Sequence, residues 1–128
     1  MSAERRKQEV DILNSRYGAI EWGSNLDWIL FKDFKLPTGW NKTNTPLLIM
    51  IPAGYPATPP DNFYVPNGLR LATGNPPANF AENQTVLGNL WAQFSFHAQG
   101  WNPASEILKG DNLQGFMLMV EKRLQELN

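Results

Sequence analysis

Apolar residues recur at helical spacing near both ends of the chain. In residues 3–17, Val10, Leu13 and Tyr17 share one helix face, while most other positions are charged or polar. This pattern is typical of a helix that lies on the outside of a domain. Ser2 is the expected N-terminal cap of this helix.

The second helical pattern occupies residues 111–127. Asp111 is the expected N-cap, and Gln114 follows three residues later, as in a capping box. Leu118 and Met119 fall outside the apolar face of this helix. That face comprises Leu113, Phe116, Met117, Val120, Leu124 and Leu127.

Three segments between the helices favour strands. Residues 26–36 alternate with a period of two, which places Ile29 and Phe31 on one face. The opposite face is expected to carry Leu26, Trp28, Leu30, Phe34 and Leu36. Residues 45–51 form a nearly continuous apolar run, typical of a central strand, and residues 62–65 form a shorter third strand.

The next part of the chain shows no clear periodicity. Residues 66–89 are rich in Pro, Gly and Asn, which indicates a long ordered loop. Residues 90–103 are aromatic and are expected to be irregular. Consecutive strands with helices at the two ends predict an α+β fold, and the length suits a single domain over residues 1–128.

Composition excludes several classes of function. The net charge of −1 argues against a nucleic-acid binder with a broad basic face. The chain has no cysteine and a single histidine, His97, so we expect no metal site and no cofactor. No apolar run has the length of a membrane span and no secretory signal is visible, so we expect no membrane partner and a cytoplasmic protein.

Four prolines stand close together directly after the central strand. Proline removes a hydrogen bond from a sheet, so these residues belong between strands. Tyr55-Pro56 is an aromatic–Pro step and a candidate for a cis bond. With Pro59 and Pro60 it predicts a stiff turn that fixes one strand against the next.

These residues resemble the ubiquitin-conjugating enzyme superfamily. YPATPP (55–60) resembles its Tyr-Pro-x-x-Pro-Pro turn, and VPNG (65–68) resembles its His-Pro-Asn tripeptide. Further along, GNLW (88–91) resembles its Gly-x-Ile-Cys motif and WNPA (101–104) resembles its Trp-Ser-Pro-Ala motif. The four motifs occur in the order that the family has. The fuller pattern is similar to a bacterial branch, the prokaryotic E-type ubiquitin-conjugating-like proteins. Members of that branch occur beside ubiquitin-like proteins and adenylating activating enzymes.

The resemblance implies a fold and a set of site residues. The implied fold has an N-terminal helix, an antiparallel meander, a long irregular active-site-like loop and a C-terminal helix. Trp91 stands at the position expected for the nucleophilic cysteine. Asn67 corresponds to the family asparagine, which the resemblance implies orients a backbone or stabilises an oxyanion; the alternative is an ordinary loop asparagine in a turn. Arg5, Arg6 and Lys7 correspond to the basic helix that docks the activating enzyme, although a solvated helix face explains them equally.

Two further residues carry candidate chemistry. His97 is either a general base or oxyanion donor, matching a downstream histidine of the bacterial branch, or a histidine that ties the aromatic loop to the backbone. Ser95 lies two residues away and is the nearest hydroxyl nucleophile. A hydroxyl needs an adjacent base and gives a poorer acyl donor than a thiol. Four aromatic residues nearby favour a core over a ligand platform: Trp91, Phe94, Phe96 and Trp101.

Three functions remain open at this point. The first is a conjugation-pathway component that binds a ubiquitin-like protein and its activating enzyme without an acyl-carrying cysteine. The second is an active conjugating enzyme whose cysteine has been replaced in this chain, at Ala92 or Ser95. The third is a hydrolase or transferase that uses His97 with a carboxylate such as Glu82 or Asp111.

Overall fold

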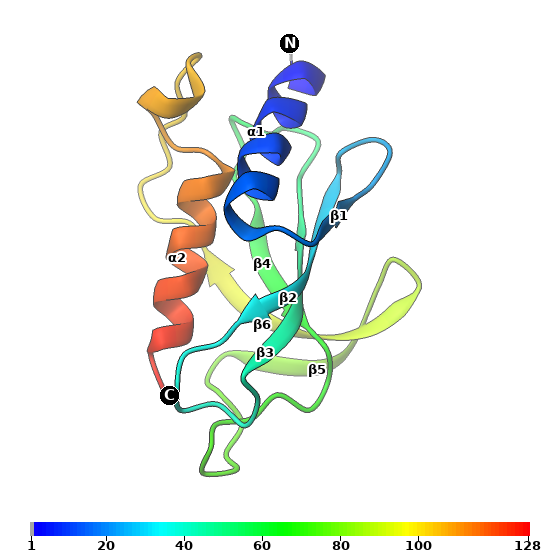
Figure 1. The fold of residues 1–128 in the computed structure, drawn as a ribbon, viewed down its shortest axis with the longest axis vertical. Helices are drawn as coiled ribbons and strands as arrows, with labels where there is room; N and C mark the ends of the chain where they lie inside the picture. The colour runs from blue at the N-terminus through cyan, green and yellow to red at the C-terminus, as the bar shows by residue number, and fades with distance from the viewer. Residues whose placement is uncertain (1) are drawn as a thin grey trace.

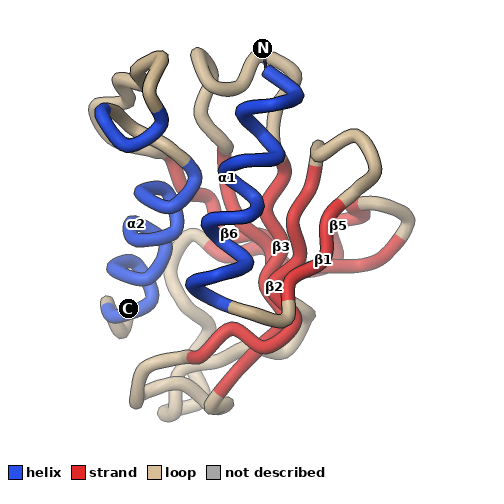
Figure 2. The backbone as a smooth tube through the Cα atoms, turned by 45° about the horizontal axis from the view of Figure 1, so that its top comes forward, coloured by secondary structure: helices blue, strands red, loops and turns tan. Residues whose placement is uncertain are grey.

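The structure, a computed structural model, describes residues 2–128, and the side chain of Ser2 lies outside that description. The described elements follow the order α1 (Ser2–Tyr17), β1 (Ile20–Trp22), β2 (Trp28–Lys35), β3 (Asn44–Met50), β4 (Asp61–Val65), β5 (Phe80–Val86), β6 (Asn89–His97), the 3-10 turn η1 (Ile107–Lys109) and α2 (Leu113–Gln125). The α+β prediction is confirmed, and Figures 1 and 2 show both α-helices packed on one face of the sheet.

The six strands form one antiparallel sheet in the order β1-β2-β3-β4-β6-β5. Strands β2, β3 and β4 make the predicted meander, with β3 in the interior of the sheet as expected, and β1 adds an edge strand that was not predicted. The connection from β4 passes beyond β6, so β5 is the outermost strand at that edge. The Tyr55-Pro56 bond in the β3–β4 turn is cis, as the sequence suggested.

The predicted faces of β2 are wrong in the middle of the strand. Ile29, Phe31 and Phe34 are all buried in the core below the helices, whereas Trp28 and Leu30 are only half-buried. The register of β2 against β3 shifts between Phe31 and Phe34. Such a bulge adds a residue to one strand and reverses the alternation beyond it, so Phe34 joins the face of Phe31.

The segment predicted to be a long loop contains a hairpin. Strands β5 and β6 pair along most of their length, and the remaining loop covers only residues 66–79. The aromatic segment predicted to be irregular is largely β6, whose Ala92 and Phe94 are fully buried. Four consecutive polar residues, 82–85, hid this strand, because a polar run without alternation reads as a loop in the sequence.

The α2 helix begins one residue later than predicted. Asn112 is the N-cap, and its side chain accepts a hydrogen bond from the amide of Gly115 at 2.8 Å. Asp111 instead accepts from the amide of Asn102. The predicted apolar face is buried except for Leu127, which is half exposed. Within residues 2–128, neither helix has the length and apolar character of a membrane span.

Candidate functional site

The proline turn is held by charged side chains of α1. Glu9 is almost completely buried, and its carboxylate accepts hydrogen bonds from the Tyr55 hydroxyl and from the amide of Leu113. Arg5 donates to the same carboxylate at 2.8 Å. One acidic side chain therefore joins α1 to the β3–β4 turn and to the first turn of α2, where a negative charge also favours the helix dipole.

The predicted turn residues lie where this network can fix them. Burial, followed by the hydrogen bond to Glu9, raises the pKa of Tyr55. The carbonyl of Pro56 accepts from the indole of Trp101 at 2.7 Å. Pro60 is buried and Pro59 is half-buried, so the turn is packed against the domain rather than surrounded by solvent.

The three basic residues predicted to dock a partner have different environments. Arg6 is buried and donates to the carbonyls of Leu26 and Pro52, at 2.9 and 2.7 Å. Arg5 points inward as well, to Glu9 and to carbonyl oxygens near α2. Only Lys7 presents its charge to solvent, beside Asp11 at 2.6 Å. The sequence could not separate them, because the long side chains of arginine reach across to neighbouring loops.

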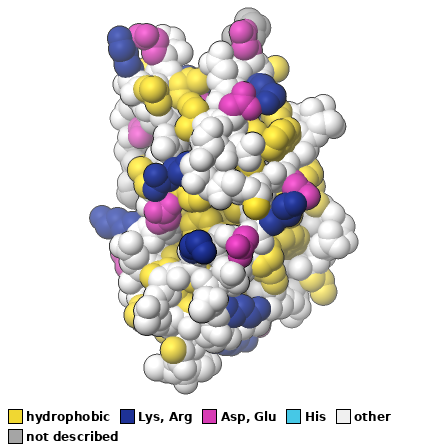
Figure 3. Space-filling view, in the orientation of Figure 1, with side chains coloured by type: hydrophobic (Ala, Val, Ile, Leu, Met, Phe, Trp, Pro, Cys, Tyr) yellow, Lys and Arg dark blue, Asp and Glu magenta, His cyan; other side chains and the backbone are white. Residues whose placement is uncertain are grey.

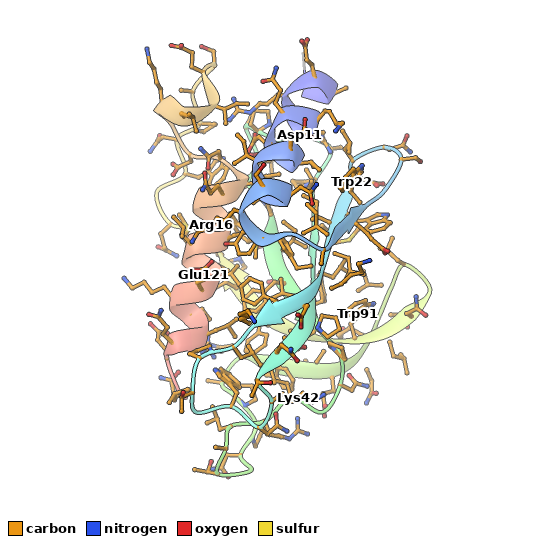
Figure 4. The ribbon with its side chains drawn as sticks, in the orientation of Figure 1. Asp11, Arg16, Trp22, Lys42, Trp91 and Glu121 are labelled. Carbon is orange, nitrogen blue, oxygen red and sulfur yellow. The ribbon has the colours of Figure 1, made fainter. Side chains whose placement is uncertain are left out.

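The expected nucleophile position lies inside the sheet. Trp91 belongs to β6 and pairs with Gln84 of β5. Its indole nitrogen is buried and has no hydrogen-bond partner among the described residues. Figure 4 labels Trp91 on this strand, beside the long β5–β6 hairpin. The neighbouring Ala92 is 0% exposed, so a side chain at that position faces the core and not a substrate.

Asn67 forms a reciprocal pair with Asn83. The Asn67 amide donates to the Asn83 side-chain oxygen at 2.9 Å and accepts from the Asn83 backbone amide at 3.2 Å. Both ends of the Asn67 amide are therefore engaged by one residue of β5. This geometry fits the backbone-orienting alternative, because the two hydrogen bonds fix the Asn67 side chain against β5.

A second contact fastens the same loop to β5. Glu82 accepts from the amide of Gly68 at 2.6 Å and forms an ion pair with Arg70 at 2.9 Å. The Arg70 guanidinium, followed by the Gly68 amide, lowers the pKa of Glu82. Glu82, predicted as a possible catalytic carboxylate, is therefore committed to holding residues 66–70 against β5.

His97 lies at the far end of β6 from Trp91. Its Nδ1 atom hydrogen-bonds to the carboxylate of Asp61, and both side chains are largely exposed. Ser95 lies two residues earlier on the same strand, but no hydrogen bond joins it to His97 among the described residues. Both border a groove of about 550 Å³ between β6 and the outer face of α2, where Lys122 and Arg123 also lie.

The predicted catalytic residues do not converge. Asn67 and Trp91 lie near one end of the β4–β6 ladder, where Val65 pairs with Ala92, whereas His97 pairs with Asp61 at the other end. Trp91 and His97 are six positions apart, which corresponds to about 20 Å along an extended strand. The arrangement offers a histidine with an orienting carboxylate but no nucleophile in contact with it.

Asp61 and Glu9 are the two site residues that the sequence reasoning missed. Asp61 follows Pro60 directly, and only strand pairing brings it to His97. Glu9 lies among other charged residues of α1, so periodicity alone assigns it to solvent. The apolar residues Val10 and Leu13, next to Glu9 and one turn after it, are the sequence signal that this part of α1 faces inward, and both are buried.

A second cavity lies between the ends of the two helices. It measures about 430 Å³ and is bordered by Tyr17, Phe34 and Glu121. Burial, followed by the hydrogen bond to Glu121, raises the pKa of Tyr17 to about 12. Arg16 lies 3.8 Å from Glu121 and faces it across the helix pair (Figure 4). Glu121 is engaged by Tyr17 and Arg16. Asp33 and Lys35 also border the cavity, and neither forms an ion pair among the described residues.

The described residues hold no cluster of three or more His, Asp or Glu side chains with the geometry of a metal site. Charges of both signs are interspersed on the face shown in Figure 3, and no broad basic patch appears there.

Comparison with known proteins adds one finding. A family model described as prokaryotic E2 family E matches residues 6–127. No curated protein and no solved structure matches the chain significantly. The match spans all six strands, α2 and most of α1, so it covers the whole arrangement described above rather than a single motif.

Proposed function

The chain belongs to prokaryotic E2 family E, and we propose that it serves a bacterial ubiquitin-like conjugation pathway as a binding component that carries no acyl group. Its partners are a ubiquitin-like protein and the adenylating enzyme that activates it, and it acts in the cytoplasm. The resemblance in sequence supplies this context.

The observation that carries the proposal is the lack of any group suited to acyl transfer. The chain has no cysteine, and the expected position is occupied by Trp91. Thiols combine ready attack with ready departure near neutral pH, and hydroxyl groups do not. Ser95 borders the same groove as His97, and among the described residues no hydrogen bond joins its hydroxyl to that histidine.

The exposed face of α1 is the proposed contact for the activating enzyme. Lys7 carries the one solvent-facing charge of the basic triplet, so charge reversal there should weaken binding and reduce its dependence on salt. Arg5 and Arg6 are unsuitable for this test, since their charges hold the fold. Unchanged affinity of a folded Lys7→Glu variant would exclude this contact.

The second partner is proposed to contact the sheet face opposite the helices, together with residues 36–41. Trp40 cannot take part directly, because it is buried and its indole donates to the carbonyl of Leu124 at 2.8 Å. The exposed neighbour Lys42 is the better probe of this region (Figure 4).

The test combines binding and chemistry. The chain is mixed with the ubiquitin-like protein and the activating enzyme encoded nearest to it, with and without ATP. We expect a stable complex by biolayer interferometry and no adduct that a thiol reductant releases. An adduct that resists reductant but yields to hydroxylamine would indicate an ester on Ser95 and overturn the proposal.

One observation favours the alternative of a conjugating enzyme with a replaced cysteine. Ser95 is exposed beside the His97–Asp61 pair and the groove, whereas Ala92 is buried. A Ser95→Cys variant that accepts the ubiquitin-like protein as a reducible adduct would support this alternative. Failure of that variant, with binding retained, would leave the binding role as the better account.

A further inference from the structure

The turn of the β5–β6 hairpin contains a residue that suits neither its backbone nor its surroundings. Val86 pairs with Asn89, so Leu87 and Gly88 form a two-residue turn. Their φ angles are 52° and 77°, as in a type I′ turn, where Asn, Asp and Gly are preferred. A bulky residue at positive φ is an outlier that needs a reason.

Packing within the chain does not supply that reason. Leu87 is 49% exposed, and Leu90, on the returning strand, is 59% exposed. Two large apolar side chains therefore stand in solvent. Figure 1 shows that the hairpin carrying them projects from the body of the domain. Backbone strain and apolar exposure at one site together point to an interaction surface.

The surroundings of these leucines narrow the kind of partner. No residue from 83 to 96 is charged, so the tip has nothing to attract an acidic or a basic surface. Strand β5 is also the outermost strand of the sheet. The opposite edge differs, because β1 has only three residues and bears the Glu21–Lys32 ion pair.

We propose that the hairpin tip binds a second copy of this chain, with Leu87 and Leu90 of each copy packed across a two-fold axis. A two-fold contact brings a patch against itself, so a charged patch repels and an uncharged apolar patch does not. The tip meets this condition without any change of shape. The contact is separate from Lys7 and from the groove beside His97, so it goes beyond the proposed function.

Sedimentation velocity of the full chain, from micromolar to millimolar concentration, tests the proposal. We expect a reversible monomer–dimer equilibrium. Leu90→Glu should weaken dimerisation by about 100-fold or more, since two leucines are lost and two like charges meet. Leu118→Glu, at a 47% exposed leucine of α2, is the matched control and should leave the equilibrium unchanged.

Two further experiments separate a direct contact from a loss of folding. Leu90→Lys and Leu90→Glu should each be monomeric alone and should associate when mixed, because the opposite charges then meet. Leu87→Asn suits the turn, so it should raise the Tm at a concentration where the native chain is monomeric, while weakening the dimer. A native chain that stays monomeric at millimolar concentration, a dimer that survives Leu90→Glu, or a dimer lost in Leu118→Glu would overturn the proposal.

Discussion

The hydroxyl of Tyr55 donates to both oxygens of the Glu9 carboxylate, at 2.7 and 2.8 Å. Tyr55 opens the proline turn and Glu9 lies in the middle of α1. The same carboxylate receives the amide of Leu113 at 2.6 Å. The buried carboxylate of Glu9 thus holds the proline turn in place. Because the turn is stiff, it also fixes β3 against β4.

Removing this acid should be severely destabilising. Glu9→Ala leaves the Tyr55 hydroxyl and the Leu113 amide without a partner and Arg5 without its ion pair, so we expect a loss of about 3–5 kcal/mol. Urea unfolding followed by tryptophan fluorescence measures it. Glu4→Ala, at an exposed position of the same helix, is the control, with a change within about 0.5 kcal/mol.

Adjacent basic residues should have opposite sensitivities. Arg6→Ala removes the hydrogen bonds to the carbonyl oxygens of Leu26 and Pro52 and should lower the free energy of unfolding by about 1.5–3 kcal/mol. Lys7→Ala should change that free energy by no more than about 0.5 kcal/mol, because Lys7 and Asp11 are both exposed. Equal losses in the two variants would show that the inward contacts of Arg6 are not stabilising.

The free energy of unfolding should decrease at alkaline pH as Tyr17 loses its proton. Its pKa is raised from 10.0 to about 12, so the folded chain retains a proton that the unfolded chain releases. The contribution is complete below pH 10 and is lost as the pH rises from 10 to about 12. Urea midpoints of the native chain and of Tyr17→Phe should therefore converge across this range, and parallel curves would contradict the shift.

Asn67 and Asn83 should act as a unit. Asn67→Ala removes both hydrogen bonds, whereas Asn83→Ala removes only the bond to its side-chain oxygen and keeps its backbone amide. The double variant should therefore cost little more than Asn67→Ala alone. A double-mutant cycle should give a coupling of about 0.5–1.5 kcal/mol. Hydrogen exchange in residues 66–70 should quicken in all three variants, and additive effects would exclude the pairing.

Cysteines introduced at Ala92 and Ser95 should differ sharply in reactivity. Ala92 is 0% exposed, so a thiol there reacts only when the chain opens. Ser95 is exposed, and its thiol should react with an aromatic disulfide reagent about 100-fold faster or more. Comparable rates would mean that this part of β6 opens readily.

Periodicity was sufficient for the helices, because their apolar faces repeat over several turns. The turn at Tyr55-Pro56 was also predictable, since its chemistry is local. The alternation along β2 failed at the bulge between Phe31 and Phe34, where one added residue reverses the faces. Pairing partners decide such a bulge, and no single strand contains that information.

The hairpin was missed for a related reason. Strand β5 carries Asn and Gln residues that are disfavoured in strands, and its turn places Leu87 where Asn is usual. The sequence named candidate residues one by one and could not name the residues that they contact. Arg6 donates to Leu26, Asn67 donates to Asn83, and His97 hydrogen-bonds to Asp61. Each contact joins segments that are distant in the sequence.

The contact between Glu9 and Leu113 spans 104 positions. On the ribosome, α1 leaves the exit tunnel early, with its acid and arginines still hydrated. Arg6 and Tyr55 can form their contacts once residue 55 has been made, but Arg5 and Glu9 need partners at Asp111 and Leu113. The N-terminal helix therefore reaches its final contacts late in synthesis, after all six strands of the sheet have been made.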